Sequence, residues 1–346
     1  MSWPGQRASS QFQPPAPRFR PVLDYPRPIS CGKVPVTLPH GRSIAARLSD
    51  GSRNVPPTAL VMLSIFSVQF GAAIAKNLFD SLGPSGTVFL RIAFAALVLL
   101  VLVRPKLGGH GRRAYIVAGL FGLALALMNL SFYQAIDRIP LGVAVTLEFV
   151  GPLGVAVAGS RRVLDVLWVV LAASGILLLA PLGAFGGMDL DPLGVAFALL
   201  AGCLWASYIF LSARTGSAFP GGMGLVIALC VGTVILAPVG IAGAGSALLD
   251  PKLLLAGFGV AMLSSAIPFS LELEALRQIP ARVFGVLMSL EPAMAALAGF
   301  VLLGERLGIR AVMAVLFVTI AAAGASLFGR QAQDRREQGS EDLLHQ

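Results

Sequence analysis

The sequence predicts an all-α membrane protein, with ten transmembrane helices arranged as two inverted repeats of five. Hydrophobic residues make up 56% of its 346 residues and charged residues only 12%, whereas a soluble domain carries about 25% charged residues. Ten apolar runs follow residue 57, and a short pattern built around a proline occurs twice, at Pro140 and at Pro280. These observations indicate a multi-pass protein built from two related halves.

The apolar runs have the length of membrane-spanning helices. Each comprises about 18–24 residues, which suits a hydrocarbon core about 30 Å thick at a rise of 1.5 Å per residue. None shows the period-two alternation of a transmembrane β-strand. Turn-forming pairs such as Gly83-Pro84 and Asp250-Pro251 separate the runs. The predicted spans are 58–79, 86–103, 114–136, 140–159, 163–182, 193–213, 222–243, 253–276, 281–303 and 310–328.

Composition divides the chain into four segments. Residues 1–57 hold 11 of the 23 prolines and eight of the 26 Lys and Arg residues, so we expect a disordered Pro/Arg-rich cytoplasmic tail. This tail is either genuine or the product of a start codon assigned too far upstream. We expect the first five-helix repeat in residues 58–182, the second in residues 193–328, and a cytoplasmic C-terminal tail in residues 329–346.

Basic residues are distributed unequally between the two sets of predicted loops. One set, together with the C-terminal tail, carries twelve Lys and Arg residues, and the other set carries four. Positively charged loops stay in the cytoplasm, so both termini are predicted to be cytoplasmic. Five spans per half is an odd number, so the second half enters the membrane from the opposite side and the repeats are inverted. The twelve are Arg104, Lys106, Arg112, Arg113, Arg161, Arg162, Arg214, Arg277, Arg282, Arg330, Arg335 and Arg336.

Each half carries an acid inside an apolar helix that a proline opens. At 1.5 Å per residue, Glu148 lies about 12 Å beyond Pro140, and Glu291 lies about 16 Å beyond Pro280 from the opposite face. In a hydrocarbon core about 30 Å thick, both acids are predicted near the midplane. An acid at this depth is costly, so its default interpretation is functional.

A second proline in each of these helices predicts a hinge. Pro152 and Pro292 have no N–H group, so the carbonyl groups of Glu148 and Met288 lose their helical partners. Free carbonyl groups are tolerated at this depth only inside the protein or beside a wet cavity. We therefore expect both prolines to kink their helices near the two acids.

Alternatives remain open for each acid. Glu148 either serves packing, through a hydrogen bond to a neighbouring helix, or lines a cavity, where it exchanges a proton or holds a substrate amine. Glu291 either does the same or belongs only to a Glu-Pro kink. Glu272 and Glu274 are predicted near the cytoplasmic end of their helix. One of these two either serves the site, snorkels to the interface or pairs with Arg277.

Two cations lie inside the predicted spans. Lys76 is close to a helix end, where snorkelling explains it. Arg91 lies deeper, where it could meet a substrate carboxylate or one of the acids. Polar and aromatic residues at cavity depth together indicate a small-solute site, although packing explains each one taken alone. They are Asn129, Tyr133, Gln134, Trp205, Ser207 and Tyr208.

Missing motifs exclude other classes of function. The chain has no G-x-x-x-x-G-K-[ST] loop for ATP and no H-E-x-x-H or G-x-S-x-G motif, and its three histidines lie outside the spans. Its three cysteines lack metal-ligand spacing. The net charge of +9 resides in the N-terminal tail and short loops, which argues against nucleic-acid binding. We expect a non-enzymatic transporter without cofactor or metal, driven by an ion or substrate gradient.

Three stretches carry a resemblance to a known family. They are Phe132–Arg162 (FYQAIDRIPLGVAVTLEFVGPLGVAVAGSRR), Gly202–Ser212 (GCLWASYIFLS) and Phe284–Glu305 (FGVLMSLEPAMAALAGFVLLGE). With the ten-helix plan, they resemble the drug/metabolite transporter superfamily, whose repeat is the EamA domain. Within it they are most similar to the bacterial threonine/homoserine exporters of the RhtA type. The resemblance covers about residues 58–328.

The resemblance implies an inner-membrane carrier that exports small neutral amino acids by proton antiport. Glu148 and Glu291 fall within the family-like motifs, with Tyr133 and Trp205 beside them. We expect a monomer or weak homodimer among membrane lipids, in which Glu148 changes protonation while the two halves rock about a midplane cavity. The alternatives are the same fold exporting a drug, a nucleobase or a purine metabolite, and a structural or sensory membrane protein without transport.

Overall fold

The computed structural model describes residues 55–105, 108–158, 163–179, 190–219, 222–279 and 281–328. Within these ranges the only regular secondary structure is helix, as predicted. The N-terminal tail up to residue 54 and the tail after residue 328 lie outside the described residues. The predictions made for those two segments therefore stay predictions.

The described residues of the first half of the chain form four long helices and two short ones. They are α2 (Pro57–Lys76), α3 (Phe79–Val103), α4 (Arg112–Arg138), α5 (Leu141–Glu148), α6 (Val150–Ala158) and α7 (Val163–Leu179). The second half contains α8 (Pro192–Ala218), α9 (Met223–Ala244), α10 (Pro251–Ala261), α11 (Ile267–Gln278), α12 (Ala281–Met288), α13 (Glu291–Leu303) and α14 (Ile309–Phe328). A 3-10 segment, η3 (Gly245–Leu249), precedes α10, and a π-helical turn, η4 (Met262–Ala266), follows it.

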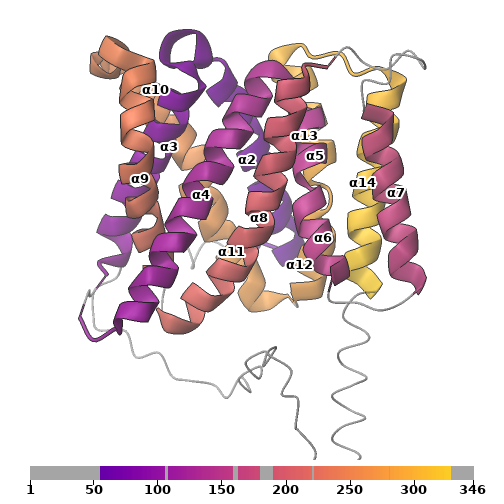
Figure 1. Cartoon of the computed structure of the whole chain (residues 1–346), viewed down its shortest axis with the longest axis horizontal. Helices are drawn as coiled ribbons and strands as arrows, with labels where there is room; N and C mark the ends of the chain where they lie inside the picture. Colours follow the sequence, from indigo (N-terminus) through magenta and orange to yellow (C-terminus); the bar gives the residue numbers. More distant parts are fainter. Residues whose placement is uncertain are drawn as a thin grey trace, which may run out of the picture. The chain divides into compact units, whose positions relative to one another are not determined.

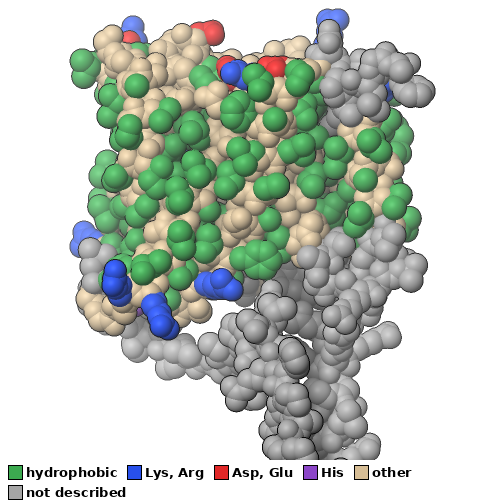
Figure 2. Space-filling view, viewed as in Figure 1, with side chains coloured by type: hydrophobic (Ala, Val, Ile, Leu, Met, Phe, Trp, Pro, Cys, Tyr) green, Lys and Arg blue, Asp and Glu red, His purple; other side chains and the backbone are tan. Residues whose placement is uncertain are grey.

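Length and composition make this a multi-pass membrane protein. Among the described residues, seven helical segments are long and apolar enough to cross a bilayer. Three shorter apolar helices accompany them, at Leu141–Val155, Leu167–Leu178 and Ile309–Gly324. Figure 2 shows hydrophobic side chains over the middle of the visible face, with Lys, Arg, Asp and Glu confined to its two ends. Such a belt suits contact with lipid chains.

The predicted spans 140–159 and 281–303 are each interrupted beside the proline at which the sequence predicted a kink. α5 and α6 separate at Phe149, shortly before Pro152. α12 and α13 separate at Ser289 and Leu290, just before Pro292. In Figure 1 the two short helices α5 and α6 are stacked end to end. The missing proline N–H explains why the hydrogen-bond ladder ends at both places.

The predicted span 253–276 contains a π-helical turn that the sequence did not indicate. Here η4 joins α10 to α11. Pro268 has no N–H, so it cannot donate to the carbonyl of Ser264 four residues earlier. That carbonyl instead accepts a hydrogen bond from Arg91 Nη2 at 3.2 Å. Single π-helical turns of this kind often occur at functional sites.

The loop predicted at Gly83-Pro84 lies inside α3. Gly83 has φ 65° and ψ 164°, a conformation that is open to glycine because it lacks a Cβ atom. Thr87 Oγ1 donates to the Gly83 carbonyl at 2.8 Å, which satisfies a group that the bend leaves free. The backbone is therefore not helical at Gly83, and α3 is kinked at the position of the predicted loop.

Small residues bring helices from the two halves of the chain into close contact. α4 packs on α8 and α9, α2 on α11 and α13, α5 on α13, and α7 on α14, a pair that stands out in Figure 1. A methyl group on Gly142 would lie 2.7 Å from Ala296 Cα, and one on Gly151 would overlap with Gly202. Small residues at such crossings are common in membrane proteins. Helices from both halves of the chain therefore surround a common cavity.

Candidate functional site

A cavity of about 500 Å³ lies between helices of the two halves. Its wall is mostly apolar, but it also carries one guanidinium group and three carboxyl groups. Seven of the eight predicted binding or coupling residues line it, together with the predicted hinge Pro152. They are Arg91, Asn129, Glu148, Trp205, Tyr208, Glu272 and Glu291.

Tyr133 and Pro292 lie behind the wall rather than on it. The Tyr133 ring is fully buried, and the Arg91 guanidinium carbon lies 5.5 Å from its centroid. Arg91 Nη1 also donates to the Tyr133 hydroxyl oxygen at 3.3 Å. Pro292 is buried in the first turn of α13. Tyr133 therefore supports the site through Arg91, and Pro292 supports it through the start of α13.

Arg91 is held over the cavity by the π-helical turn. Its Nε donates to Ser265 Oγ at 3.4 Å and its Nη2 donates to the Ser264 carbonyl at 3.2 Å. These contacts are long, so the guanidinium keeps the capacity to form shorter bonds with an anionic ligand. A planar guanidinium fork matches a carboxylate with two parallel bonds.

Two of the three cavity acids are bonded to α2. Gln69 Nε2 donates to Glu291 Oε1 at 3.0 Å, and Ser64 Oγ donates to Glu272 Oε1 at 2.6 Å. Glu291 is the first residue of α13, where the helix dipole favours an acid. Glu272 lines the cavity and bonds to Ser64, rather than snorkelling as one interpretation of the sequence proposed.

Glu148 differs from the other two acids. It ends α5, only 8% of its surface is exposed, and its carboxyl group has no hydrogen-bond partner among the described residues. A role in packing alone would require a hydrogen bond from the Glu148 side chain to a neighbouring helix, and the described residues provide none. Its backbone packs against α8, because a methyl group on Gly202 would lie only 2.6 Å from the Glu148 carbonyl oxygen.

Aromatic side chains shape the wall on the side of α8. Trp205 lies edge-on to Phe149, with ring centroids 5.3 Å apart, and Tyr208 lies 5.0 Å from Phe121. Phe149 is the residue at which α5 and α6 separate. This contact therefore ties the helix break to the cavity wall.

Four residues that contact the cavity acids or Arg91 were not predicted from the sequence. Ser64 and Gln69 hold acids and Ser265 holds Arg91 through their side chains, whereas Ser264 holds Arg91 through its backbone carbonyl. The available signal was the presence of polar side chains within apolar spans, because such side chains in a membrane usually bond to another helix. The partner that each of these residues contacts depends on the tertiary structure and cannot be deduced from the spacing of residues in the sequence.

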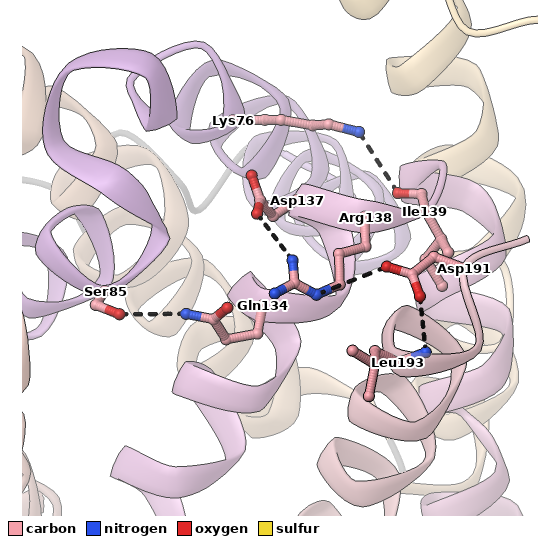
Figure 3. Close-up of polar contacts among 8 residues, drawn as sticks. All are labelled: Lys76, Ser85, Gln134, Asp137, Arg138, Ile139, Asp191 and Leu193. Atoms are coloured by element: carbon pink, nitrogen blue, oxygen red, sulfur yellow. Dashed lines mark hydrogen bonds and ion pairs between the residues drawn. The ribbon is translucent and has the colours of Figure 1, made fainter. Parts of the chain in front are cut away.

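A polar layer covers the end of the helices where α2 finishes. Lys76 Nζ donates to Glu305 Oε1 at 2.8 Å, and Glu305 Oε2 accepts from the backbone N–H of Leu141 at 2.9 Å. Figure 3 shows Lys76 also reaching the Ile139 carbonyl, and Arg138 lying between Asp137 and Asp191. We call the Lys76, Glu305 and Leu141 set the terminal clamp.

Known proteins resemble the chain over most of its length. The EamA-like transporter family matches residues 192–327. The threonine/homoserine exporter RhtA of Salmonella typhimurium strain LT2 is 40% identical over 271 residues, which cover 78% of this chain and 91% of that protein. The Escherichia coli K12 protein of the same name is 38% identical over 281 residues, covering 81% and 95%. The chain belongs to the EamA-like transporter family.

The fold is also represented among solved structures. One crystal structure superposes with a TM-score of 0.54 and 17% sequence identity, covering 79% of this chain and 98% of the other. At this identity the likeness concerns the fold alone. In this member of the EamA-like family, the described residues contain no cluster of His, Cys, Asp or Glu that could hold a metal ion.

Proposed function

We propose that the protein exports small neutral amino acids, with threonine and homoserine as substrates, across the bacterial inner membrane. The observation that carries the proposal is the pairing of one guanidinium with several carboxyl groups in a single cavity. A zwitterionic amino acid carries a carboxylate, which would bind to the guanidinium, and an ammonium group, which would bind to a carboxyl group. The names of the two RhtA relatives support the same substrates.

The cavity suits such a solute in size and character. Its volume of about 500 Å³ falls within the range of about 300–1,000 Å³ that is usual for small-molecule sites. Arg91 would receive the carboxylate, and Glu148 is the cavity acid free to receive the ammonium group. Trp205 and Tyr208 would limit the size of the side chain. A purine or nucleobase would leave the charged groups without partners, so it is the weaker alternative.

We further propose ten membrane spans in two inverted repeats, 58–182 and 193–328, with both termini in the cytoplasm. The three short apolar helices would complete the seven longer ones. Similar helix breaks beside Pro152 and Pro292 support related halves and make these prolines candidate hinges. The excess of basic residues in one set of loops supports the orientation.

We infer from the lining that, in this orientation, the conformation is open toward the cytoplasm. The cavity lining includes Phe284, in the first turn of α12, and Glu272 of α11, both in the cytoplasmic part of their helices. Toward the periplasm the lining ends at residues such as Ala72, below the terminal clamp. Rocking of the two halves would close one side and open the other, and proton antiport would supply the driving force.

Transport in reconstituted vesicles tests this proposal. Purified protein in proteoliposomes is expected to take up labelled threonine and homoserine when a pH gradient is imposed, and unlabelled threonine is expected to compete. Glu148→Gln keeps the shape of the side chain and should abolish uptake, while protein-free liposomes give the background. Uptake of labelled purines instead of threonine would transfer the proposal to the alternative substrates. Full-rate threonine uptake by Glu148→Gln would remove Glu148 from the mechanism.

A further inference from the structure

The pair formed by Gln69 and Glu291 contains two buried atoms without partners. Gln69 Nε2 donates to Glu291 Oε1 at 3.0 Å. The remaining side-chain oxygens, Gln69 Oε1 and Glu291 Oε2, are both buried and neither has a hydrogen-bond partner. The two side chains are themselves 2% and 8% exposed. Buried polar atoms of this kind are rare, and each one requires an explanation.

Both orphan atoms are acceptors as long as Glu291 is ionised. An amide oxygen and a carboxylate oxygen carry no hydrogen, so neither can satisfy the other. A proton on Glu291 Oε2 changes this, because a protonated carboxyl group is both a donor and an acceptor. A carboxylic acid and a primary amide can then pair through two hydrogen bonds, one in each direction. A single proton therefore accounts for both orphan atoms.

We propose that Glu291 is the proton-carrying group of the transport cycle and that Gln69 is the positioning residue that holds its protonated form. This inference rests on the proposed export function, and it moves the proton from Glu148, where the sequence suggested it, to Glu291. In the exchange, an O–H bond forms on Glu291 with a proton from periplasmic water. The same bond breaks when the proton leaves to cytoplasmic water.

The charges around Glu291 favour this division of roles. The charged groups that face it among the described residues are Glu148 from α5 and Glu272 from α11, while α2 contributes only the neutral Gln69. Arg91 of α3 interacts with Glu148. Three ionised acids facing one guanidinium would be costly beside a cavity wall that is mostly apolar. With Glu291 neutral, Glu148 remains free to meet the substrate ammonium group beside Arg91.

The position of the pair links the proton to the movement of the protein. Gln69 belongs to α2 in the first half, and Glu291 begins α13 in the second half. Movement of one half against the other would separate the amide from the acid. The pair is intact in this cytoplasm-open conformation, so the proton bound from periplasmic water would leave to the cytoplasm here, and the movement that opens the periplasmic side would separate the pair and expose the ionised Glu291 to its next proton.

Infrared spectroscopy of the full-length protein in lipid nanodiscs tests the protonation directly. At neutral pH, wild type is expected to show a carboxyl C=O band that shifts in D₂O. The band should be absent in Glu291→Gln, remain in Glu148→Gln, and move in Gln69→Leu, which removes the hydrogen-bond partner. Persistence of the band in Glu291→Gln, or its absence from wild type, would overturn the assignment. Glu291→Gln should fold, because its new amide can donate to Gln69 Oε1 as the acid does.

Transport measurements give an independent readout. In wild type, threonine accumulation with an imposed pH gradient should exceed accumulation without it. In Glu291→Gln the two values should be equal, and a surviving dependence on the gradient would contradict the inference. If wild type transports no threonine, the proposed export function fails, whereas the infrared measurement still decides whether Glu291 is protonated.

Discussion

Lys76 and Glu305 form an ion pair of 2.8 Å that joins the end of α2 to the segment between α13 and α14. The Glu305 carboxylate also accepts the backbone N–H of Leu141 through its second oxygen, at 2.9 Å. One side chain therefore holds the start of α5, the end of α2 and the end of α13 together. Gly299 provides the room, since a methyl group there would overlap with Glu305 Oε2.

Loss of the ion pair is expected to open this end of the cavity more often. Glu305→Gln keeps an oxygen for Leu141 but removes the charge that binds Lys76. A hydrogen bond between charged groups contributes about 1.5–3 kcal/mol, and about 1.4 kcal/mol is a factor of ten. The population open to the periplasm should therefore rise roughly ten- to a hundredfold. Labelling of Ala72→Cys in intact cells by an impermeant maleimide measures it, with the three native cysteines replaced.

Lys252 supplies the control for this experiment. It is exposed at the start of α10 and has no ion pair among the described residues. Lys76→Met should accelerate labelling as Glu305→Gln does, whereas Lys252→Met should not. Equal labelling rates in wild type and in both clamp variants would show that the ion pair does not hold this end closed.

The parts of the fold that depend on local sequence were predictable. Length and composition of the apolar runs identified an all-helical membrane protein, and the proline positions marked where α5 and α12 end. The kink of α3 at Gly83 coincides with a predicted loop, whereas the π-helical turn before Pro268 was not predicted. The π-helical turn depends on a tertiary partner, because Arg91 uses the carbonyl freed at Ser264. The inverted relation of the two halves stays a prediction.

The site was predictable in its membership but not in its pairings. The predicted depth of each residue in the membrane identified Arg91 and the acids as candidate site residues, and the structure places them around one cavity. The ion pair of Lys76 was not predicted, because its partner Glu305 lies 229 residues away in sequence. No spacing rule connects residues so distant. For the same reason Gln69, the partner of Glu291, went unnoticed.

Gly151 and Gly154 of α6 form a matched pair for testing the helix crossing. A methyl group on Gly151 would overlap with Gly202, whereas one on Gly154 would meet nothing within 4 Å. Overpacking costs about 1–3 kcal/mol, so Gly151→Ala should lower the thermal unfolding midpoint of the purified protein. Gly154→Ala should leave it unchanged or raise it, because alanine favours a helix by roughly 0.5–1 kcal/mol. Equal midpoints for the two variants would mean that α6 and α8 are not in close contact.

Arg91→Lys is expected to weaken substrate binding although it keeps the charge. Lysine lacks the planar fork that matches a carboxylate with two bonds, and loss of one charged hydrogen bond costs about 1.5–3 kcal/mol. The KM for threonine should rise at least about tenfold in proteoliposomes. Tyr133→Phe removes only a long bond of 3.3 Å and should have a smaller effect. An unchanged KM in Arg91→Lys would exclude bidentate binding of the carboxylate.

Ser264 and Ser265 separate the structural and functional roles of the π-helical turn. Ser264 Oγ is buried without a hydrogen-bond partner, while Ser265 Oγ accepts from Arg91 Nε at 3.4 Å. An unsatisfied buried hydroxyl costs about 1–3 kcal/mol, so Ser264→Ala should raise the unfolding midpoint and leave threonine affinity nearly unchanged. Ser265→Ala should instead raise the KM for threonine, because Arg91 is no longer oriented by that hydroxyl. If Ser264→Ala lowers the midpoint, its hydroxyl has a partner such as a bound water, and the π-helical turn is stabilised by that contact rather than by Pro268 and Arg91.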